Sequence, residues 1–143
     1  MPSDHFAQIR ASFARQGMMQ TFEAQLTALG PGHCEITAPI LPLACQQHGA
    51  GHAALGFALG DTAAGYAALT LMAPGREVMT AEIKINLLAP AVGTRLIARG
   101  RVVKSGRRLS VVTAEVEAEA AEGSRRLIAV MQGTMVPVDP VPD

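Results

Sequence analysis

One apolar segment near the middle of the chain limits the possible folds more than any other feature. Residues 52–73 read HAALGFALGDTAAGYAALTLMA, which is about as long as a helix that crosses a bilayer. Asp61 stands at the centre, where a charge costs roughly 2.5 to 3.5 kcal/mol on membrane insertion, and the surrounding Gly and Ala residues offset little of that. We therefore predict a buried helix of a soluble protein, from about His52 to Met72, closed by Pro74 and Gly75.

Small residues recur along this predicted helix. Gly56, Gly60 and Ala64 are spaced by four, so they share one face of a helix. A glycine inside a helix costs roughly 0.5 to 1 kcal/mol against alanine, so several of them indicate that close packing compensates. Either the helix of a second subunit or a sheet wrapped around this helix would supply that packing.

The rest of the chain predicts strands, with one short amphipathic helix before them. Phe6, Ile9 and Phe13 follow Asp4, a candidate N-cap, at helical spacing as far as about Gly17. Strands are expected at about 21–29, 33–40, 80–87, 95–103, 109–119 and 126–136, separated by Gly, Pro and charged turns. Thr80, Glu82, Lys84 and Asn86 would form the polar face of the third strand. The order predicts an α+β fold, with a mostly antiparallel sheet carrying the long helix on one face, as one domain over residues 1–143.

Composition excludes several classes of function. Lys plus Arg equals Asp plus Glu at 12 each, so no overall charge favours nucleic acid or an anionic membrane. Cys34 and Cys45 do not have a metal-ligand spacing, and reduced thiols suit the cytoplasm. The first residues contain no apolar stretch typical of a secretion signal.

Asp61 and the start of its helix are the two strongest candidates for chemistry. A carboxylate in an apolar helix is costly unless it is paired or used as a general base or nucleophile, although it could also face solvent. Free backbone N–H groups at a helix start can bind a developing oxyanion. Ala53 and Asp61 lie roughly 12 Å apart on one helix, so both can act on one substrate only if two subunits share the site.

Two further features could contribute to a site. His52 could be a base, but we favour a histidine that shapes the loop through a hydrogen bond. A cationic turn follows the fourth strand, and it is either a solvated hairpin tip or a clamp for phosphates such as those of coenzyme A. Its residues are Lys104, Ser105, Gly106, Arg107 and Arg108.

These motifs together resemble the PaaI-like acyl-CoA thioesterases of the hotdog-fold superfamily. The matching stretches are QQHGAGHAALGFALGDTAAGYAA, then TAEIKINLLAPA, then RGRVVKSGRRL, over roughly residues 35–135. The resemblance implies a hotdog fold, in which an antiparallel sheet wraps one long helix. It also implies that subunits pair edge to edge into dimers, which commonly associate into tetramers.

The resemblance implies roles for individual residues. Asp61 matches the catalytic acid, described as base or nucleophile. Ala53 matches a glycine whose N–H binds the thioester oxygen, and alanine keeps that N–H. Gln46 falls on a position that is commonly Asn and that orients water or the leaving group, and Thr80 matches a hydroxyl position near the acid. Thr80 could equally be only a β-branched strand residue.

We therefore predict a cytoplasmic acyl-CoA thioesterase that acts on a medium-chain or aromatic acyl group. Coenzyme A enters as part of the substrate, without a metal or redox cofactor, and the enzyme is a homodimer or homotetramer. One alternative is a hotdog enoyl-CoA hydratase or dehydratase, which would need a His and an acid in one site. The other is a non-catalytic acyl-CoA binding module, which would need the pocket but no active Asp61.

Overall fold

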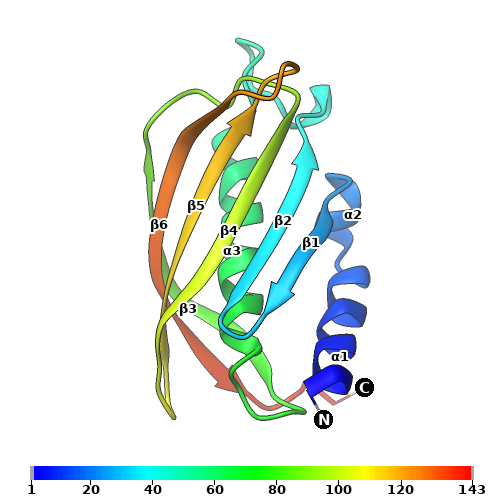
Figure 1. Ribbon diagram of the computed structural model, residues 1–143, viewed down its shortest axis with the longest axis vertical. Helices are drawn as coiled ribbons and strands as arrows, with labels where there is room; N and C mark the ends of the chain where they lie inside the picture. Colours follow the sequence, from blue (N-terminus) through cyan, green and yellow to red (C-terminus); the bar gives the residue numbers. More distant parts are fainter. Residues whose placement is uncertain (1, 143) are drawn as a thin grey trace.

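The computed structural model describes residues 2–142, so the ends of the predicted 1–143 domain, Met1 and Asp143, lie outside the described residues. Two N-terminal helices are followed by a hairpin, a long helix and four more strands (Figure 1). The elements are α1 Pro2–Ala14, α2 Gly17–Thr21, β1 Gln25–Gly30, β2 His33–Pro39, the 3₁₀ turn η1 Pro42–Ala44, α3 Ala53–Leu69, β3 Glu77–Leu87, β4 Arg95–Ser105, β5 Ser110–Glu119 and β6 Arg125–Val138.

All six strands form one antiparallel sheet in the order β1-β2-β4-β5-β6-β3. The sheet curves around α3, and α1 and α2 lie beside its β1 edge (Figure 1). The predicted α+β architecture, a sheet wrapped around one long helix with a short N-terminal helix, is confirmed. No helix within residues 2–142 is long and apolar enough to span a membrane. Most of the apolar 52–73 segment forms α3, whose buried residues belong to the core.

The helix is held very close to the sheet. A Cβ on Gly100 of β4 would lie 2.4 Å from the backbone of Ala63, so only glycine permits this approach. Gly60 faces the sheet as well, because a Cβ there would strike the side chain of Met131. Gly56 differs, since a Cβ on it meets nothing within 4 Å. On the predicted small-residue face, Gly60 therefore allows close packing against the sheet, while Gly56 borders open space.

The outer face of the sheet carries ion pairs instead of a second layer. Arg99 bonds Glu35 and Glu117, and Arg95 and Arg125 both bond Glu119. These two arginines hold the pKa of Glu119 at about 2, against an ordinary value of 4.5. Ile97, which points outward between these pairs, is 1% exposed because the long charged side chains cover it.

A β-bulge in β3 corrects the predicted two-residue alternation of that strand. Thr80 pairs with Met135 and Glu82 pairs with Thr134, so Ala81 is one extra residue on β3. The extra residue moves Thr80 to the face that points toward α3, away from the face of Glu82, Lys84 and Asn86. The predicted common polar face is therefore wrong at Thr80, and the reason is a pairing irregularity that the period of two does not reveal.

The N-terminal segment also differs in detail from the prediction. The first helix begins at Pro2, with Asp4 in its first turn, and residues 17–21 form a second helix where a strand was expected to begin. Ile9 is fully buried, and Phe6 and Phe13 pack against the core. The predicted short amphipathic helix is thus present, followed by a second helical turn.

Candidate functional site

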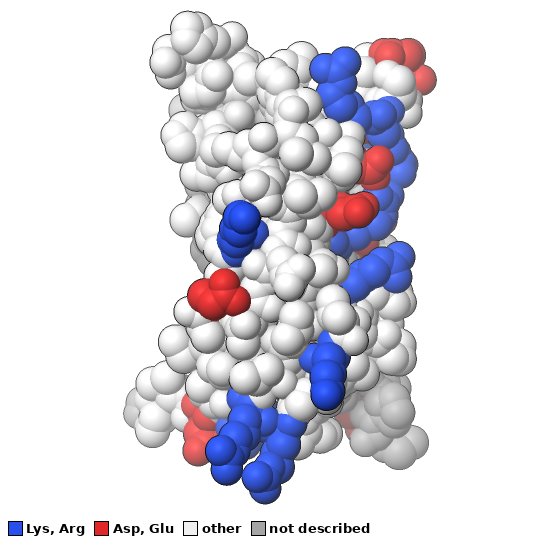
Figure 2. Space-filling view, turned by 90° about the vertical axis from the view of Figure 1, so that its left-hand side faces the viewer, with Lys and Arg blue, Asp and Glu red and all other residues white. Residues whose placement is uncertain are grey.

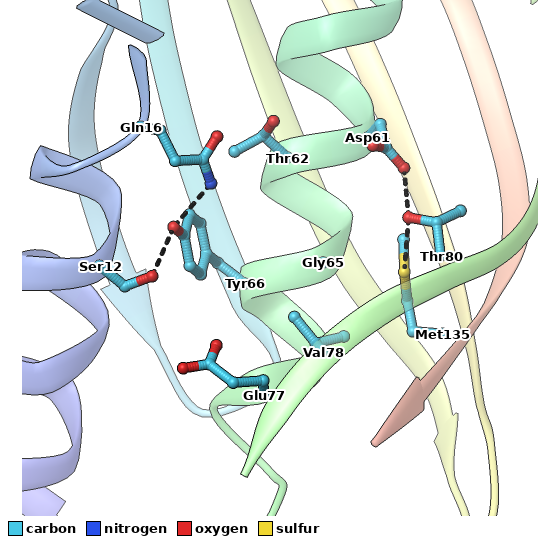
Figure 3. A pocket seen from close by; sticks show the side chains of 10 residues that line it. All are labelled: Ser12, Gln16, Asp61, Thr62, Gly65, Tyr66, Glu77, Val78, Thr80 and Met135. Carbon is cyan, nitrogen blue, oxygen red and sulfur yellow. Dashed lines mark hydrogen bonds between the residues drawn. The ribbon is translucent and has the colours of Figure 1, made fainter. Parts of the chain in front are cut away.

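Asp61 lies near the middle of α3, half-buried, at the wall of a hollow of about 200 Å³. The hydroxyl of Thr80 donates a hydrogen bond to Asp61 Oδ1 at 2.7 Å (Figure 3). Within residues 2–142 Asp61 forms no ion pair, and its second carboxylate oxygen has no hydrogen-bond partner. One oxygen is therefore oriented by Thr80, and the other is available to a water or a substrate.

The remaining walls of this hollow, named here the acid hollow, come from both ends of the chain. Tyr66 stands on α3 and is only 4% exposed. Its hydroxyl accepts a hydrogen bond from Gln16 Nε2 at 2.7 Å and shares another with the Ser12 hydroxyl at 3.0 Å (Figure 3). Burial raises the pKa of Tyr66, so the phenol keeps its proton at neutral pH. The lining is completed by Thr62, Gly65, Glu77, Val78 and Met135.

A second hollow, named here the helix-start hollow, lies where α3 begins. It measures about 530 Å³ and holds Gln46, His52 and Ala53 beside Gly56. Its opposite wall is apolar and comes from the end of β3, the loop after it and β6: Leu87, Leu88, Ala89, Pro90, Ala91, Ile128 and Ala129. The structure therefore brings three of the sequence-predicted site residues together here.

His52 and Ala53 prepare the start of the helix. His52 is the N-cap, and its Nδ1 accepts a hydrogen bond from the backbone N–H of Ala54 at 2.9 Å. This contact is the loop-shaping hydrogen bond that we favoured for His52. The N–H of Ala53 has no acceptor within residues 2–142, so it can donate to an oxygen in the hollow.

Gln46 is fixed by its own turn. Its side-chain oxygen accepts a hydrogen bond from the N–H of His48, and its backbone N–H donates to the carbonyl of Ala50 at 2.8 Å. The side-chain NH₂ group has no acceptor among residues 2–142. Gln46 therefore presents a donor near Ala53, while Asp61 and Thr80 present an acceptor and a hydroxyl elsewhere.

The two hollows have no lining residue in common. Ala53 and Asp61 are the first and ninth residues of α3, which places them roughly 12 Å apart along its axis. The acid hollow supplies a carboxylate, and the helix-start hollow supplies free N–H donors. Within one chain these groups cannot meet on one small reacting centre.

The cationic turn lies at a third place. Lys104, Ser105, Gly106, Arg107 and Arg108 are all exposed, and none of the three cations forms an ion pair within residues 2–142. The turn joins β4 to β5 at the end of the sheet where α3 ends, opposite the end where α3 begins (Figure 1). In one chain it is therefore remote from Ala53.

The β3 edge of the sheet is uncovered. Among the described residues 2–142, β3 pairs only with β6, whereas the β1 edge has α1 and α2 beside it. Met79 and Leu87 on β3 are each 59% exposed. Figure 2 shows that the side of the molecule with β6 and β3 is mostly uncharged: a few charged side chains lie on the face itself, and the others gather along one border and at the lower end.

The two cysteines take no part in either hollow. Burial raises the pKa of the Cys34 thiol to about 12, so it remains protonated and unreactive. Cys45 is half-buried, and its thiol donates to the carbonyl of Leu41 at 3.4 Å.

Sequence reasoning missed Ser12, Gln16, Tyr66 and Glu77. Only Tyr66 could have been noticed in the sequence. It is the only tyrosine of the chain, and it stands four residues after Thr62 on the predicted helix, so the two polar side chains share one face. Phe57, an aromatic residue on the same helix, lines neither hollow and is 37% exposed.

Comparisons with known proteins agree with this geometry. The model of the thioesterase superfamily matches residues 48–123, which contain α3, β3, β4 and β5. A thioesterase family protein from Silicibacter pomeroyi is 40% identical, with a TM-score of 0.92 over 95% of this chain and 99% of that one. A conserved protein from Pseudomonas aeruginosa is 27% identical, with a TM-score of 0.77 over 86% and 94% of the two chains.

The E. coli PaaI protein, from the phenylacetic acid degradation operon, shares the fold. Its TM-score is 0.82 at 17% identity, over 96% of this chain and 95% of that one. No curated protein sequence matches this chain. The family match covers more than half of the chain, and the resemblance inferred from the motifs is confirmed. The chain belongs to the thioesterase superfamily, a family of thioester hydrolases, and has its hotdog fold.

Proposed function

We propose that the protein hydrolyses an acyl-CoA to a free acid and coenzyme A, in a site shared by two subunits. The observation that carries the proposal is the separation of the two hollows on one helix. Each hollow contains half of what thioester hydrolysis needs: a carboxylate in one, and N–H donors at a helix start in the other.

A two-fold axis at the β3 edge would bring the halves together. Pairing β3 with its copy in the antiparallel direction makes one continuous sheet and turns the second subunit end for end. The start of the second subunit's α3 then faces the end at which the first subunit's α3 finishes. The exposed Met79 and Leu87 of β3 would be covered.

In the proposed reaction, the N–H of Ala53 from one subunit donates to the thioester carbonyl oxygen. The free oxygen of Asp61 from the other subunit takes a proton from water, and the water oxygen attacks the carbonyl carbon. The carbon–sulfur bond then breaks, and the thiolate of coenzyme A leaves and takes up the proton. In the other form of the reaction Asp61 attacks directly, and water hydrolyses the resulting anhydride.

Gln46 and Thr80 have supporting roles in this proposal. The NH₂ group of Gln46 faces the same hollow as Ala53, so it can orient the water or the leaving sulfur. Thr80 holds Asp61 in one rotamer through the 2.7 Å hydrogen bond. His52 acts as a cap that keeps the N–H groups in place, not as a base, because its Nδ1 already accepts from Ala54.

The cationic turn is the proposed contact for coenzyme A phosphates. In the two-fold pair, the turn of one subunit lies at the same end of the continuous sheet as the helix start of the other. Arg107, Arg108 and Lys104 are exposed and unpaired within residues 2–142, so they can bind phosphate oxygens. The acyl group, medium-chain or aromatic, would occupy the acid hollow, whose volume of about 200 Å³ exceeds the roughly 150 Å³ that holds a benzene ring.

Thiol release from a panel of acetyl-, hexanoyl-, benzoyl- and phenylacetyl-CoA tests the proposal, with wild type beside Asp61→Asn. We expect hydrolysis of at least one thioester and its loss in the variant, with fold and oligomer retained. Asp4→Asn, an exposed aspartate on α1, is the matched control and should keep full activity. If wild type binds acyl-CoA and cleaves none, the protein is a binding module and the proposal is wrong.

A further inference from the structure

The acid hollow is polar at the end away from Asp61. That end is formed by Ser12, Gln16 and Tyr66, where α1 and α2 meet α3 (Figure 3). Lys, Arg and His are absent from the lining that residues 2–142 provide. A hollow that served only an alkyl chain would be lined by apolar side chains, so its polar groups call for a specific explanation.

Two hydrogen-bonding groups in this hollow are unused within residues 2–142. Gln16 donates a hydrogen bond from Nε2 to the Tyr66 hydroxyl, and its Oε1 has no donor. The Thr62 hydroxyl also has no partner. In Figure 3 the Gln16 oxygen points away from Tyr66, on the side where Thr62 lies. With Gln16 Nε2 donating to the Tyr66 hydroxyl, the amide oxygen is the group that faces the cavity, and it can act there as an acceptor.

Gly65 keeps space open between the carboxylate and this acceptor. A Cβ built on Gly65 meets only Val78, at 3.9 Å, so packing does not exclude a side chain there. Its backbone is regular helix, and glycine lowers helix stability at such a position. The glycine therefore leaves room in the hollow at a cost to the helix.

Charge restricts what can occupy that room. Asp61 and Glu77 both line the hollow, and no cation lies with them among residues 2–142. An acyl group ending in a carboxylate would be repelled by both. An acyl group ending in a methyl would take water from Gln16 and Thr62 without replacing their hydrogen bonds.

From these contacts we propose that the enzyme selects acyl groups whose far end is a neutral hydrogen-bond donor, such as a hydroxyl or an amide NH₂, which bonds Gln16 Oε1. This inference rests on the proposed function and names its substrate class. Asp61 and Tyr66 are separated by roughly 7.5 Å along α3, which suits an acyl group of six-carbon or single-ring length. Gln16 and Thr62 are the specificity-determining residues, and Tyr66 is a positioning residue that acts through Gln16.

Three CoA thioesters of equal chain length test the inference: hexanoyl, 6-hydroxyhexanoyl and adipoyl. Thiol release should give a kcat/KM for the hydroxy substrate about tenfold above that for hexanoyl-CoA, expressed mainly in KM. Adipoyl-CoA should be the poorest of the three. Equal values for hexanoyl and 6-hydroxyhexanoyl would overturn the inference and leave the thioesterase proposal intact, whereas no cleavage of any thioester would overturn both.

Variants assign the selectivity to residues. Gln16→Leu should bring the kcat/KM values for the hydroxy and alkyl substrates together, and Gln8→Leu on the exposed side of α1 should keep the tenfold ratio. If thermal unfolding shows that Gln16→Leu is not folded, Gly65→Ala serves instead. It should lower kcat/KM for both six-carbon substrates about threefold relative to acetyl-CoA, because its methyl enters the hollow beyond the reacting carbonyl. An unchanged ratio in a folded Gln16→Leu protein would remove Gln16 from the proposal.

Discussion

The two hollows along α3 differ in almost everything that matters for catalysis. The acid hollow is small and polar, and its carboxylate is oriented by a strand hydroxyl. The helix-start hollow is larger, has an apolar wall, and offers free N–H groups but no acid. The difference teaches that, in the proposed reaction, one helix carries both halves but cannot join them within one chain, so the proposal makes association of two subunits part of the chemistry.

The largest expected effect comes from removing the N–H donor at the start of α3. Ala53→Pro removes one N–H and leaves the helix intact, because proline is favoured at the first helical position and the extended backbone of His52 already suits a following proline. We expect about a 10²- to 10³-fold loss of kcat, whereas Ala53→Ser should keep its activity.

Mixing two inactive variants tests whether the N–H donor and the carboxylate of one site come from different subunits. Ala53→Pro and Asp61→Asn subunits, refolded together in equal amounts, should recover about a quarter of wild-type activity, because half of the dimers are mixed and each has one intact site of two. Measured recovery near zero, with mixed dimers confirmed by mass, would place both halves in one subunit.

A smaller effect is expected within the acid hollow. Thr80→Val keeps the shape of the side chain and removes the hydroxyl that orients Asp61. We expect kcat to fall about tenfold with little change in KM, and Thr80→Ser to restore most of it. Loss of activity in both variants would show that the strand packing at this position matters, not the hydrogen bond.

The next effect is expected at the β3 edge, where the two subunits would pair. Met79→Lys places a charge on β3, and charged residues on edge strands oppose pairing with another strand. The dissociation constant of the dimer should rise about tenfold in analytical ultracentrifugation, and activity at low protein concentration should fall with it. Val103→Lys, equally exposed on β4, is the control that should leave the dimer unchanged.

The smallest effect is expected from the cationic turn, which lies outside both hollows. Arg107→Gln together with Arg108→Gln should raise KM for acyl-CoA about threefold, because exposed charges are screened by salt. The same change should flatten the dependence of KM on ionic strength. A KM that still rises with salt as in wild type would place the phosphates elsewhere.

The elements set by local pattern were predictable from the sequence. The 52–73 segment and the period-two runs after Arg76 led to one helix and a sheet because helical and strand periods are readable within ten residues. The structure keeps them, with α3 ending at Leu69 instead of Met72. Asp61 was identified because a lone charge in an apolar helix is conspicuous, and the structure places it in a hollow.

The parts that depend on distant partners were not predictable. Ser12 and Gln16 meet Tyr66 across 54 and 50 residues, and their polar character alone does not indicate which face of α1 and α2 meets α3. The bulge at Ala81 depends on how β6 aligns with β3, so period-two reasoning assigned Thr80 to the wrong face. A strand was expected from about Thr21, but Thr21 belongs to α2, which buries Met19, and the strand begins only at Gln25.

The extra residue in β3 makes position 81 tolerant of deletion as well as of replacement. Many side chains at Ala81 should be tolerated, because the position is exposed and faces neither the core nor Asp61. Removing Ala81 would join Thr80 directly to Glu82, which gives strict alternation with Thr80 still opposite Met135 and still on the face toward α3. The chain can therefore lose one residue at this position without moving the hydroxyl that orients Asp61.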